Sequence, residues 1–446
     1  MALTGIQIYK LLPKTNCGEC GVPTCLAFAM ALAAGKAELA ACPYVSEEAK
    51  EQLAEASAPP IRPVVIGSDG RSLKVGGETV LFRHEKTFYN PCGLAGQLSD
   101  TDPELLEKAK RWAGLKWERI GLTLQPELVF LKCESADPDK LTAAAKALAE
   151  NTDFSMILAC EDPQVLAPAA KALKDKKPLL YAATQANADK MCELAGETGC
   201  PLAVKGVDLE EVVELTTELT EAGLKDLVID SGARDLAGAF LDQVAIRRAA
   251  LLDKNRALGF PTIAFANAMG DSLAEQTAAA AMLLPKYAGI IVMDELAPES
   301  LFPLLLQRLN IYTDPQRPMA TSPGIYEING PDENSPLCVT SNFSLTYFIV
   351  SGEIEASRVP SWLLVVDTEG LSVMTAWAAG KFAGDAIGIF MKKSGAVGKV
   401  KHKKVIIPGY AAAIAGDLEE ELVDWTVLVG PREASALSAY LKEFKA

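Results

Sequence analysis

Four of the chain's ten cysteines lie close together near its start, and their spacing is that of a metal site. They are Cys17, Cys20, Cys25 and Cys42, separated by two, four and sixteen residues. Thiolates are soft ligands that select zinc, copper(I) or iron–sulfur clusters, and three of them on a tight loop suit a compact multi-iron core. Gly18 and Gly21 let that loop curl, and Pro43 follows the last cysteine, as in many cluster sites.

Three interpretations of the four thiols compete. A structural zinc site usually pairs two Cys-x2-Cys knuckles, and this chain has one. Unrelated buried thiols scatter singly, as the other cysteines do: Cys92, Cys133, Cys160, Cys192, Cys200 and Cys338. We therefore expect a [4Fe–4S] cluster, with a helix in residues 26–41 returning the chain to its fourth ligand. The spacing differs from the common ferredoxin patterns, so it predicts a cluster more directly than a cluster type.

Length and charge limit what the rest of the chain can be. A chain of 446 residues is expected to form two or three domains. Its net charge of −15 argues against nucleic acid as a general partner. We see neither a signal peptide nor an apolar run of the roughly 20 residues that cross a membrane, and unpaired cysteines favour a reducing cytoplasm. The basic stretch 392–404 reads as a solvated loop, with a docking patch as the alternative.

Composition divides the chain into five parts. We expect a cluster domain over 1–57, a linker with a β-hairpin over 58–92, a barrel over 93–312, a second linker over 313–336 and a ligand-binding domain over 337–446. The prolines of "SAPPIRP" (57–63) predict an extended tether. Asp69-Gly70 and Gly76-Gly77 are turn signals of a hairpin, which we expect to cap the following domain.

The middle region alternates short apolar runs with helical segments, a pattern typical of a parallel sheet. The runs that predict strands are 128–133, 155–160, 178–183, 201–206, 226–232, 262–268 and 289–294, and one more is expected at 86–90. Eight strands favour a TIM (β/α)₈ barrel, whose chemistry would lie at the carboxyl ends of the strands. Those ends carry Glu161, Asp162, Asp230, Asn267, Asp294 and Glu295. Without a metal set or a histidine base, a scaffold is the favoured interpretation and a catalytic pocket the alternative.

The last third reads as a small open α/β sheet of the Rossmann-like kind. We expect strands at 344–354, 361–370, 403–412 and 424–433, with helices between and after them. An open sheet binds its ligand beyond the carboxyl ends of its strands. The candidate residues there are Gly370, Leu371, Ser372, Val373, Thr375, Gly409, Tyr410, Gly430, Pro431, Arg432 and Glu433, with Thr340, Ser341, Asn342, Ser344 and Thr346 before the first strand. No P-loop or G-x-G-x-x-G is present, so a nucleotide is disfavoured.

The order of these parts resembles a known family. "NCGECGVPTC" with "ACP" in the head, and "VVDTEGLSVMTAW" in the last third, are similar to the large (gamma) subunit of the corrinoid iron–sulfur protein of the reductive acetyl-CoA (Wood–Ljungdahl) pathway. The resemblance covers the whole chain. It implies that the head holds a [4Fe–4S] cluster and that the last domain holds a cobamide, a cobalamin-type corrinoid.

The resemblance also implies a function and partners. The protein would be the methyl-carrier component of a corrinoid methyltransferase system. It would take a methyl group from methyltetrahydrofolate through a methyltransferase and deliver it to acetyl-CoA synthase/carbon monoxide dehydrogenase. A small subunit would complete a heterodimer. Two alternatives stay open: an iron–sulfur electron-transfer activator of another corrinoid protein, and a pterin-binding methyltransferase built on the barrel.

The histidines bear on how a corrinoid would be held. The usual signature Asp-x-His-x-x-Gly is absent, because His84 and His402 lie in "LFRHEK" and "VKHKKV". Cobalt without a histidine ligand is easier to reduce to nucleophilic cobalt(I), and a low-potential cluster would restore that state after oxidation. Under the resemblance Thr375 lies over the reactive face, residues 370–373 pack on the corrin or its nucleotide tail, and Thr340 and Thr346 bond its periphery.

Overall fold

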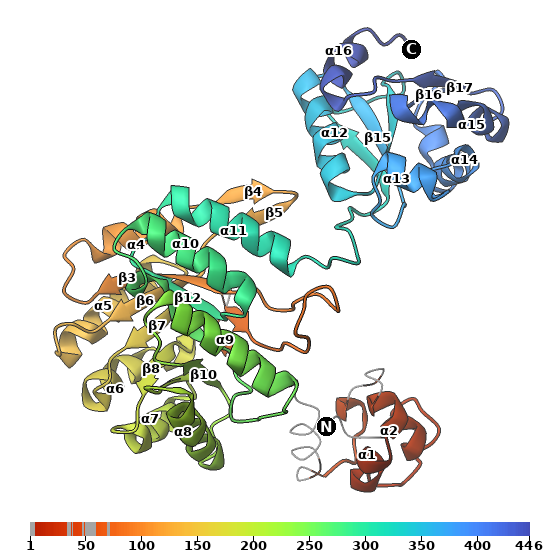
Figure 1. Ribbon diagram of the computed structural model, residues 1–446. Helices are drawn as coiled ribbons and strands as arrows, with labels where there is room; N and C mark the ends of the chain where they lie inside the picture. The colour runs from red at the N-terminus through yellow and green to blue at the C-terminus, as the bar shows by residue number, and fades with distance from the viewer. Residues whose placement is uncertain (1–4, 34–36, 38, 47–48, 50–58, 69–71) are drawn as a thin grey trace. The chain divides into compact units, whose positions relative to one another are not determined.

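The structure is a computed structural model that describes residues 5–33, 37, 39–46, 49, 59–68 and 72–446 (Figure 1). The chain divides into two compact units. The first unit holds the head and the barrel, that is, the described residues up to 82 together with 88–116 and 125–312. The second unit holds the tail (313–446) together with two short segments, 83–87 and 117–124.

The barrel is a sheet of eight parallel strands in the order β10-β9-β8-β7-β6-β3-β12-β11. Its strands are β3 (Gly93–Ser99), β6 (Leu128–Lys132), β7 (Ser155–Ala159), β8 (Leu179–Ala183), β9 (Leu202–Lys205), β10 (Leu227–Asp230), β11 (Ile263–Phe265) and β12 (Ile290–Met293). A single bridge between Ile229 and Thr262 joins the two ends of the sheet. The expected α/β barrel is therefore confirmed, with near-complete closure.

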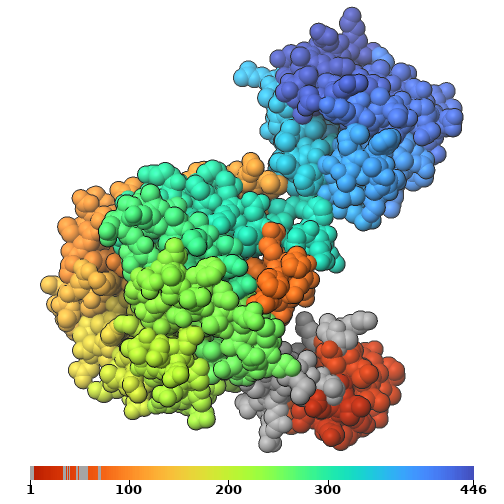
Figure 2. All heavy atoms as spheres, in the orientation of Figure 1, coloured from red at the N-terminus to blue at the C-terminus, as the bar shows by residue number. Residues whose placement is uncertain are grey.

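Eight helices surround this sheet: α4 (Leu105–Ala113), α5 (Pro138–Asn151), α6 (Pro163–Ala172), α7 (Ala188–Thr198), α8 (Leu209–Glu221), α9 (Leu236–Leu251), α10 (Leu273–Leu283) and α11 (Pro298–Tyr312). Their atoms cover the face of the barrel seen in Figure 2. A short antiparallel hairpin, β4 (Trp117–Arg119) with β5 (Leu122–Leu124), is inserted between α4 and β6.

One predicted barrel strand is wrong. Residues 86–90 form no strand, and the eighth strand is β3, which begins three residues later. β3 has the sequence GLAGQLS, whose glycines weaken a propensity-based strand signal. Gly96 is needed there because a Cβ would lie 2.5 Å from the ring of Trp112. Gly96 thus allows α4 to pack closely on β3, and it also weakens the pattern from which the strand could have been predicted.

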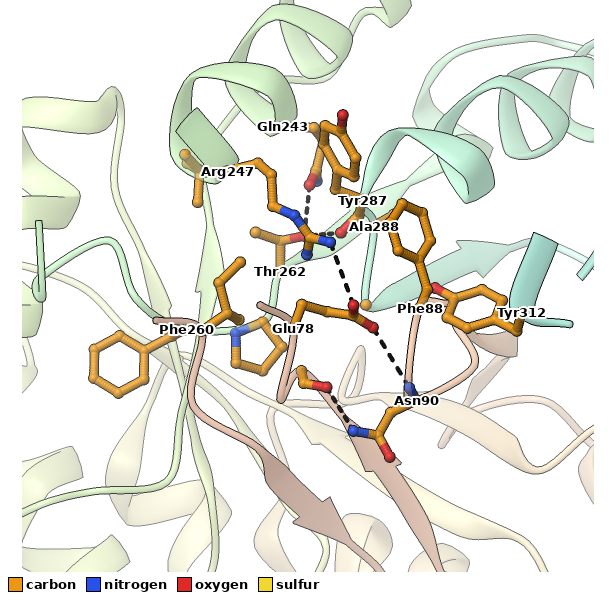
Figure 3. Close-up of a pocket in the computed structure, with 15 residues that line it drawn as sticks. Glu78, Phe88, Asn90, Gln243, Arg247, Phe260, Thr262, Tyr287, Ala288 and Tyr312 are labelled. Carbon is orange, nitrogen blue, oxygen red and sulfur yellow. Dashed lines mark hydrogen bonds and ion pairs between the residues drawn. The ribbon is translucent and has the colours of Figure 1, made fainter. Parts of the chain in front are cut away.

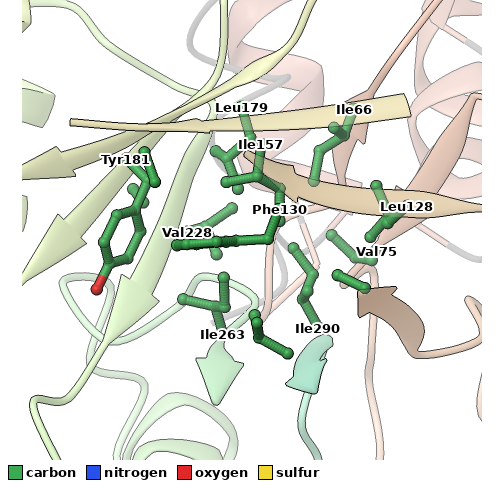
Figure 4. Close-up of a cluster of buried hydrophobic side chains, with 14 of the residues drawn as sticks. Ile66, Val75, Leu128, Phe130, Ile157, Leu179, Tyr181, Val228, Ile263 and Ile290 are labelled. Carbon is green, nitrogen blue, oxygen red and sulfur yellow. The ribbon is translucent and has the colours of Figure 1, made fainter. Parts of the chain in front are cut away.

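The barrel interior is a dry core of side chains from alternate positions of the strands. Leu128, Phe130 and Ile157 point inward together (Figure 4), and Ala159 belongs to the same buried cluster. Phe130 packs edge-on against Tyr181 and Phe265, with ring centroids 5.4 and 5.5 Å apart. The core is therefore filled by side chains and is not a channel.

A two-stranded hairpin closes the amino-terminal end of the barrel. β1 (Val64–Ile66) pairs antiparallel with β2 (Leu73–Val75), and Val64, Ile66, Leu73 and Val75 join the barrel core. The expected hairpin that caps the barrel is confirmed, although Asp69-Gly70 lies outside the described residues. Gly76 and Gly77 have φ of +79° and +77° and redirect the chain after β2.

The described end of the predicted tether lies against the same end of the barrel. The N–H of Arg62 donates to the Gly259 carbonyl at 2.9 Å, and the Arg256 guanidinium donates to the Pro59 carbonyl at 3.2 Å. Residues 59–63 are thus bonded to the barrel, whereas 57 and 58 lie outside the described residues.

A buried ion pair lies beneath the hairpin. The Arg247 guanidinium is 3.4 Å from the Glu78 carboxylate, with side chains 3% and 8% exposed (Figure 3). Burial raises the pKa of Glu78, against the opposite pull of Arg247. The rings of Phe88 and Tyr287 stack on the guanidinium at 5.1 and 4.7 Å. The pair joins the segment after β2 to α9.

We expect Arg247→Ala to lower the free energy of unfolding of the barrel by about 3–5 kcal/mol, because Glu78 is left buried without its counter-charge. Arg111→Ala, which breaks an exposed pair with Glu295, should cost about 0–1 kcal/mol. Native-state hydrogen exchange of peptides from β10 to β12 measures both. Equal effects of the two substitutions would show that the buried pair is not a structural anchor.

The tail is a five-stranded sheet in the order β13-β15-β14-β16-β17, with β13 antiparallel to β15 and the other pairs parallel. The elements are β13 (Gly324–Ile328), β14 (Leu337–Ser341), α12 (Ser344–Ser357), β15 (Ser361–Val366), α13 (Val373–Ala378), α14 (Gly384–Lys393), β16 (Lys404–Ile407), α15 (Ala415–Glu421), β17 (Thr426–Val429) and α16 (Leu437–Lys442). Helices cover both faces, α12 and α16 on one and α13 to α15 on the other.

The strand predicted at 344–354 is wrong, because these residues lie in the helix α12. Their short apolar run cannot be told from a strand by periodicity alone. The strand is the preceding segment, β14, and a parallel neighbour requires a crossover helix after it. β13 lies within the segment 313–336, for which we expected a linker.

The head is a small helical module. Its elements are α1 (Gly5–Leu11), α2 (Cys25–Ala33) and a 3₁₀ turn at Leu39–Ala41. The helix expected in 26–41 is present as α2, and residues 34–36 and 38 lie outside the described part. Throughout the described residues, no helix has the length and apolar character needed to cross a membrane.

Candidate functional site: a cavity at the edge of the tail sheet

A cavity of about 260 Å³ lies at the carboxyl edge of the tail sheet. Eight residues predicted from the sequence line it: Thr340, Thr346, Ser372, Val373, Tyr410, Gly430, Pro431 and Arg432. They come from the end of β14, from α12, from the start of α13 and from the loops after β16 and β17, and the parallel strands bring them together. Sequence reasoning missed the apolar part of the lining, including Cys338, Val350 and Ile406, because these residues read as ordinary core.

Two hydroxyl groups at the end of β14 have no hydrogen-bond partner among the described residues. They are Oγ1 of Thr340 and Oγ of Ser341, whose residues are 1% and 0% exposed. Buried hydroxyls are normally bonded, so each unpaired group calls for an explanation. Thr340 lines the cavity, and a bound molecule with donors or acceptors would satisfy it.

The side chain of Asn342, one of the predicted site residues, makes four hydrogen bonds within the tail. Its Oδ1 accepts from the N–H of Thr368 at 3.0 Å, the hydroxyl of Thr368 at 2.8 Å and the N–H of Gly370 at 2.9 Å. Its Nδ2 donates to Asp367 at 3.1 Å. Asn342 therefore holds the loop after β15 in place.

That loop carries the candidate residues 370–375. Gly370 has φ of +76°, and a Cβ there would lie 2.9 Å from the Pro318 carbonyl oxygen. Leu371 packs against the tail core. The hydroxyls of Ser372 and Thr375 are 3.0 Å apart at the start of α13, where Thr375 is exposed and outside the cavity lining. Thr375 is thus accessible to a large molecule on the cavity mouth.

The loops after β16 and β17 meet at the opposite side of the cavity. A Cβ on Gly409 would lie 2.6 Å from the Gly430 carbonyl oxygen, so glycine permits this close approach. The Tyr410 hydroxyl donates to Glu433 at 3.0 Å, and the Arg432 guanidinium lies 5.8 Å from the Tyr410 ring. Exposed Arg432 is the cation at the cavity mouth.

Neither histidine lines this cavity. His402 lies before β16, at the amino-terminal edge of the sheet, where its Nε2 is 3.0 Å from the Ser335 carbonyl oxygen. Its Nδ1 accepts from the N–H of Lys404 at 3.0 Å. His84 lies in the segment 83–87, which precedes the barrel strand β3 in the sequence.

The head brings the four predicted cysteines into one module. Cys25 and Cys42 belong to the head core, Cys20 packs against it and Cys17 is exposed. Gly18 and Gly21 have φ of +76° and +79°, as the curled loop requires. The N–H of Cys25 donates to the Asn16 side chain at 2.8 Å.

These thiols fit a soft metal cluster by their chemistry and their placement on one loop and its returning segment. Among the described residues, no three cysteine, histidine or acidic side chains already converge as a ligand set. Metal binding is coupled to folding in such modules, so the thiolates would come together around the metal.

The acids at the mouth of the barrel are paired rather than poised for catalysis. Asp230 bonds Arg234 at 2.8 Å and the hydroxyl of Tyr181 at 2.6 Å. Glu161 pairs with Lys205, and Asp294 bonds the side chains of Asn267 and Gln276, while Glu295 pairs with Arg111. Asp162 caps α6. The arrangement supports the scaffold interpretation.

The basic stretch 392–404 is largely neutralised by neighbouring acids. Lys392 pairs with Glu421, Lys401 with Glu333 and Lys403 with Asp424. The interpretation as a solvated loop fits these pairs better than a docking patch does.

The parts thus define a class of protein: a thiol-rich head, a (β/α)₈ barrel whose mouth acids are paired, and an open α/β domain with a cavity at its sheet edge. Comparison with known proteins agrees. Residues 63–441 match the family model described as CO dehydrogenase/acetyl-CoA synthase delta subunit, and residues 12–44 match a putative Fe-S cluster model. The chain belongs to the family of corrinoid/iron–sulfur protein large subunits.

Full-length relatives support this assignment. The chain is 46% identical over 444 residues to the corrinoid/iron-sulfur protein large subunit of Moorella thermoacetica, covering 99% of both chains. It is 37% identical over 455 residues to the acetyl-CoA decarbonylase/synthase complex subunit gamma of Methanothermobacter thermautotrophicus, again covering 99% of both. A dihydropteroate synthase from Vibrio fischeri overlaps 53% of this chain and all of its own, with 14% identity and a TM-score of 0.40, and bears on no functional argument.

We expect Asn342→Ala to destabilise the tail by about 2–4 kcal/mol, because the N–H groups of Thr368 and Gly370 lose their buried acceptor. The effect should appear as faster hydrogen exchange in residues 367–373. Asn334→Ala removes an exposed side chain of the same domain and should change stability by less than about 0.5 kcal/mol. Unchanged hydrogen exchange in the Asn342 variant would show that the loop after β15 keeps its conformation without the Asn342 side chain.

Proposed function

We propose that this protein carries methyl groups on a corrinoid bound at the tail cavity, in the way the family resemblance implies. The observation that carries the proposal is the cavity itself. It gathers eight predicted residues, among them Thr340 with its unpaired buried hydroxyl, at the carboxyl edge of an open sheet. That edge is where such sheets bind ligands.

The residues around the cavity would hold different portions of a corrinoid. Thr340, Ser341 and Thr346 offer hydroxyls to amide groups. Arg432 suits a phosphate, because it is the exposed cation at the mouth. The apolar lining suits an aromatic base of the nucleotide tail. Gly370, Leu371, Gly409, Gly430, Pro431 and Glu433 would shape the loops around it, and Asn342 would position them.

Above the mouth, Thr375 would lie nearest to the reacting face, with Ser372 holding its hydroxyl. Met374 and Trp377 are 41% and 42% exposed on the same helix, so they can shield that face from water. When bound, the corrinoid would supply cobalt(I) as the nucleophile for methyl groups, and a [4Fe–4S] cluster would supply the electron that restores cobalt(I) after oxidation. Cys17, Cys20, Cys25 and Cys42 would hold that cluster.

Partners follow from the exposed surface around the mouth and from the family. We propose a small subunit that completes a heterodimer and covers the mouth, a methyltetrahydrofolate methyltransferase as donor and acetyl-CoA synthase/carbon monoxide dehydrogenase as acceptor. The proposed location is the cytoplasm. The paired acids of the barrel mouth disfavour the barrel as a pterin-dependent methyltransferase, and the tail cavity disfavours a cluster-only activator.

We expect Cys20→Ala or Cys42→Ala to remove most of the iron while leaving cobalt near its normal content, because the two sites lie in separate parts of the chain. Cys192→Ala, a substitution of a lone thiol on α7, should keep both metals. Elemental analysis of the purified variants measures this. Equal loss of iron and cobalt would contradict separate sites.

A second test separates ligand binding from folding. Thr340→Val removes an unpaired buried hydroxyl, so the ligand-free protein should be as stable as before or more stable, while corrinoid affinity falls by about 2–10-fold. Ser357→Ala removes a hydroxyl that donates to the Ile354 carbonyl at 2.6 Å, so it should lower stability and leave affinity unchanged. Corrinoid titration and thermal unfolding of each variant provide both readouts. Wild-type affinity in Thr340→Val would place the ligand elsewhere.

A further inference from the structure

Two cysteines outside the head are placed side by side at the carboxyl rim of the barrel. Lys132 faces Ala159 in the pairing of β6 with β7, so the next facing residues are Cys133 and Cys160. The ladder continues through them: Cys133 N–H donates to the Ala159 carbonyl at 2.9 Å, and Cys160 N–H donates to the Tyr181 carbonyl at 2.7 Å.

Both thiols point to the same side of the sheet. Phe130 and Ala159 belong to the barrel interior, and side chains alternate along a strand, so Cys133 and Cys160 both point outward toward the helices. Neighbouring strands lie about 4.8 Å apart, within the Cα separations of about 4.4–6.8 Å that a disulfide spans.

Polar groups next to the two thiols connect them to the loop that carries Asp100. Cys133 and Cys160 influence each other electrostatically, and the carboxylate of Asp100 acts on Cys133 in the same way. Asp100 is fixed in turn by the N–H groups of Glu134 and Ser135 and by the Ser135 hydroxyl. Both cysteines are partly exposed, so a small reagent can reach them.

We propose that Cys133 and Cys160 form a redox-active dithiol, which a small-molecule disulfide converts into a cross-strand disulfide. One thiol gives up its proton and attacks the reagent, releasing one small thiol. The second thiol then displaces the reagent's other half. The protein loses two hydrogens with their electrons, and the reagent gains both as two thiols. The new bond ties β6 to β7 at the rim.

The placement of the thiols favours the cross-link over a mixed disulfide. Burial raises the pKa of Cys160 to about 11 and also raises that of Cys133, so both are protonated at neutral pH and the first step is slow. The second step is intramolecular between neighbouring groups and is therefore much faster. Cys192 shares the raised pKa through burial and lies alone on α7, which makes it a matched reference.

The test treats the full chain, with its iron–sulfur cluster loaded and oxygen excluded, with oxidised glutathione at pH 8. Tryptic peptides 133–140 and 147–171 carry one of the two cysteines each. Mass spectrometry without reduction should find them joined, lighter by two hydrogens. A mixed glutathione disulfide accumulating on either cysteine, or reaction of Cys192 alone, would overturn the proposal.

Two further measurements test the proposal in ways that a folding defect of a variant would not mimic. In Cys133→Ser, the share of Cys160 found as the glutathione adduct should rise about tenfold or more, because the resolving thiol is gone. In the wild-type chain, phenylarsine oxide, which bridges two thiols, should protect both cysteines from iodoacetamide at one equivalent. Labelling of both despite the arsenical would show that the thiols are too far apart and would overturn the proposal.

Discussion

The structure depends on one constraint: a parallel sheet delivers the loops that follow its strands to a single edge. Both sheets of this chain obey it, with opposite results. In the barrel the edge is filled by ion pairs, such as Asp230 with Arg234 and Glu161 with Lys205. In the tail the edge is left open, with a cavity and the unpaired hydroxyls of Thr340 and Ser341. The same topology therefore gives an edge occupied by paired side chains in one domain and an edge with an open cavity in the other.

Hydrogen bonds and close contacts between loops maintain the open edge, and these hydrogen bonds occupy some of the polar groups there. Asn342 gives its whole side chain to the loop after β15, and Gly409 and Gly430 bring two more loops into close approach. Gly430 also lines the cavity, together with the hydroxyl of Thr340, the exposed Arg432 and the apolar floor around Val350 and Ile406.

Much of this arrangement could be predicted from the sequence because burial leaves a strong pattern. Apolar runs such as 128–133 and 289–294 predicted barrel strands that the structure confirms. β3 was missed because its two glycines weaken the strand signal, although packing requires them: Gly96 faces Trp112, and Gly93 faces Leu73 and Leu128. The helix α12 was mistaken for a strand because "YFIV" suits either element. The role of Asn342 could not be predicted, since it depends on which amide groups the loop after β15 brings near it.

In the proposed function the head holds the cluster, the barrel serves as a scaffold and the tail holds the corrinoid. The proposed chemistry of the corrinoid depends on a tail cavity whose lining contains no histidine. A corrinoid held by hydroxyls and packing, with His402 bonded at the far edge of the sheet, has no imidazole to stabilise its oxidised cobalt. Such a cofactor is reactive when reduced and needs an electron source when oxidised, and the four thiols of the head provide for one. A matched pair of cofactors is therefore the core of the proposed function.

The most direct test is the metal content and visible spectrum of the protein purified without oxygen together with its partner subunit. We expect cobalt and iron in the ratio of one corrinoid to one four-iron cluster, and corrin absorption bands that persist after a chelator removes the iron. Iron without cobalt, or bands that vanish with the iron, would contradict a corrinoid in the tail and would leave only a cluster-bearing electron carrier.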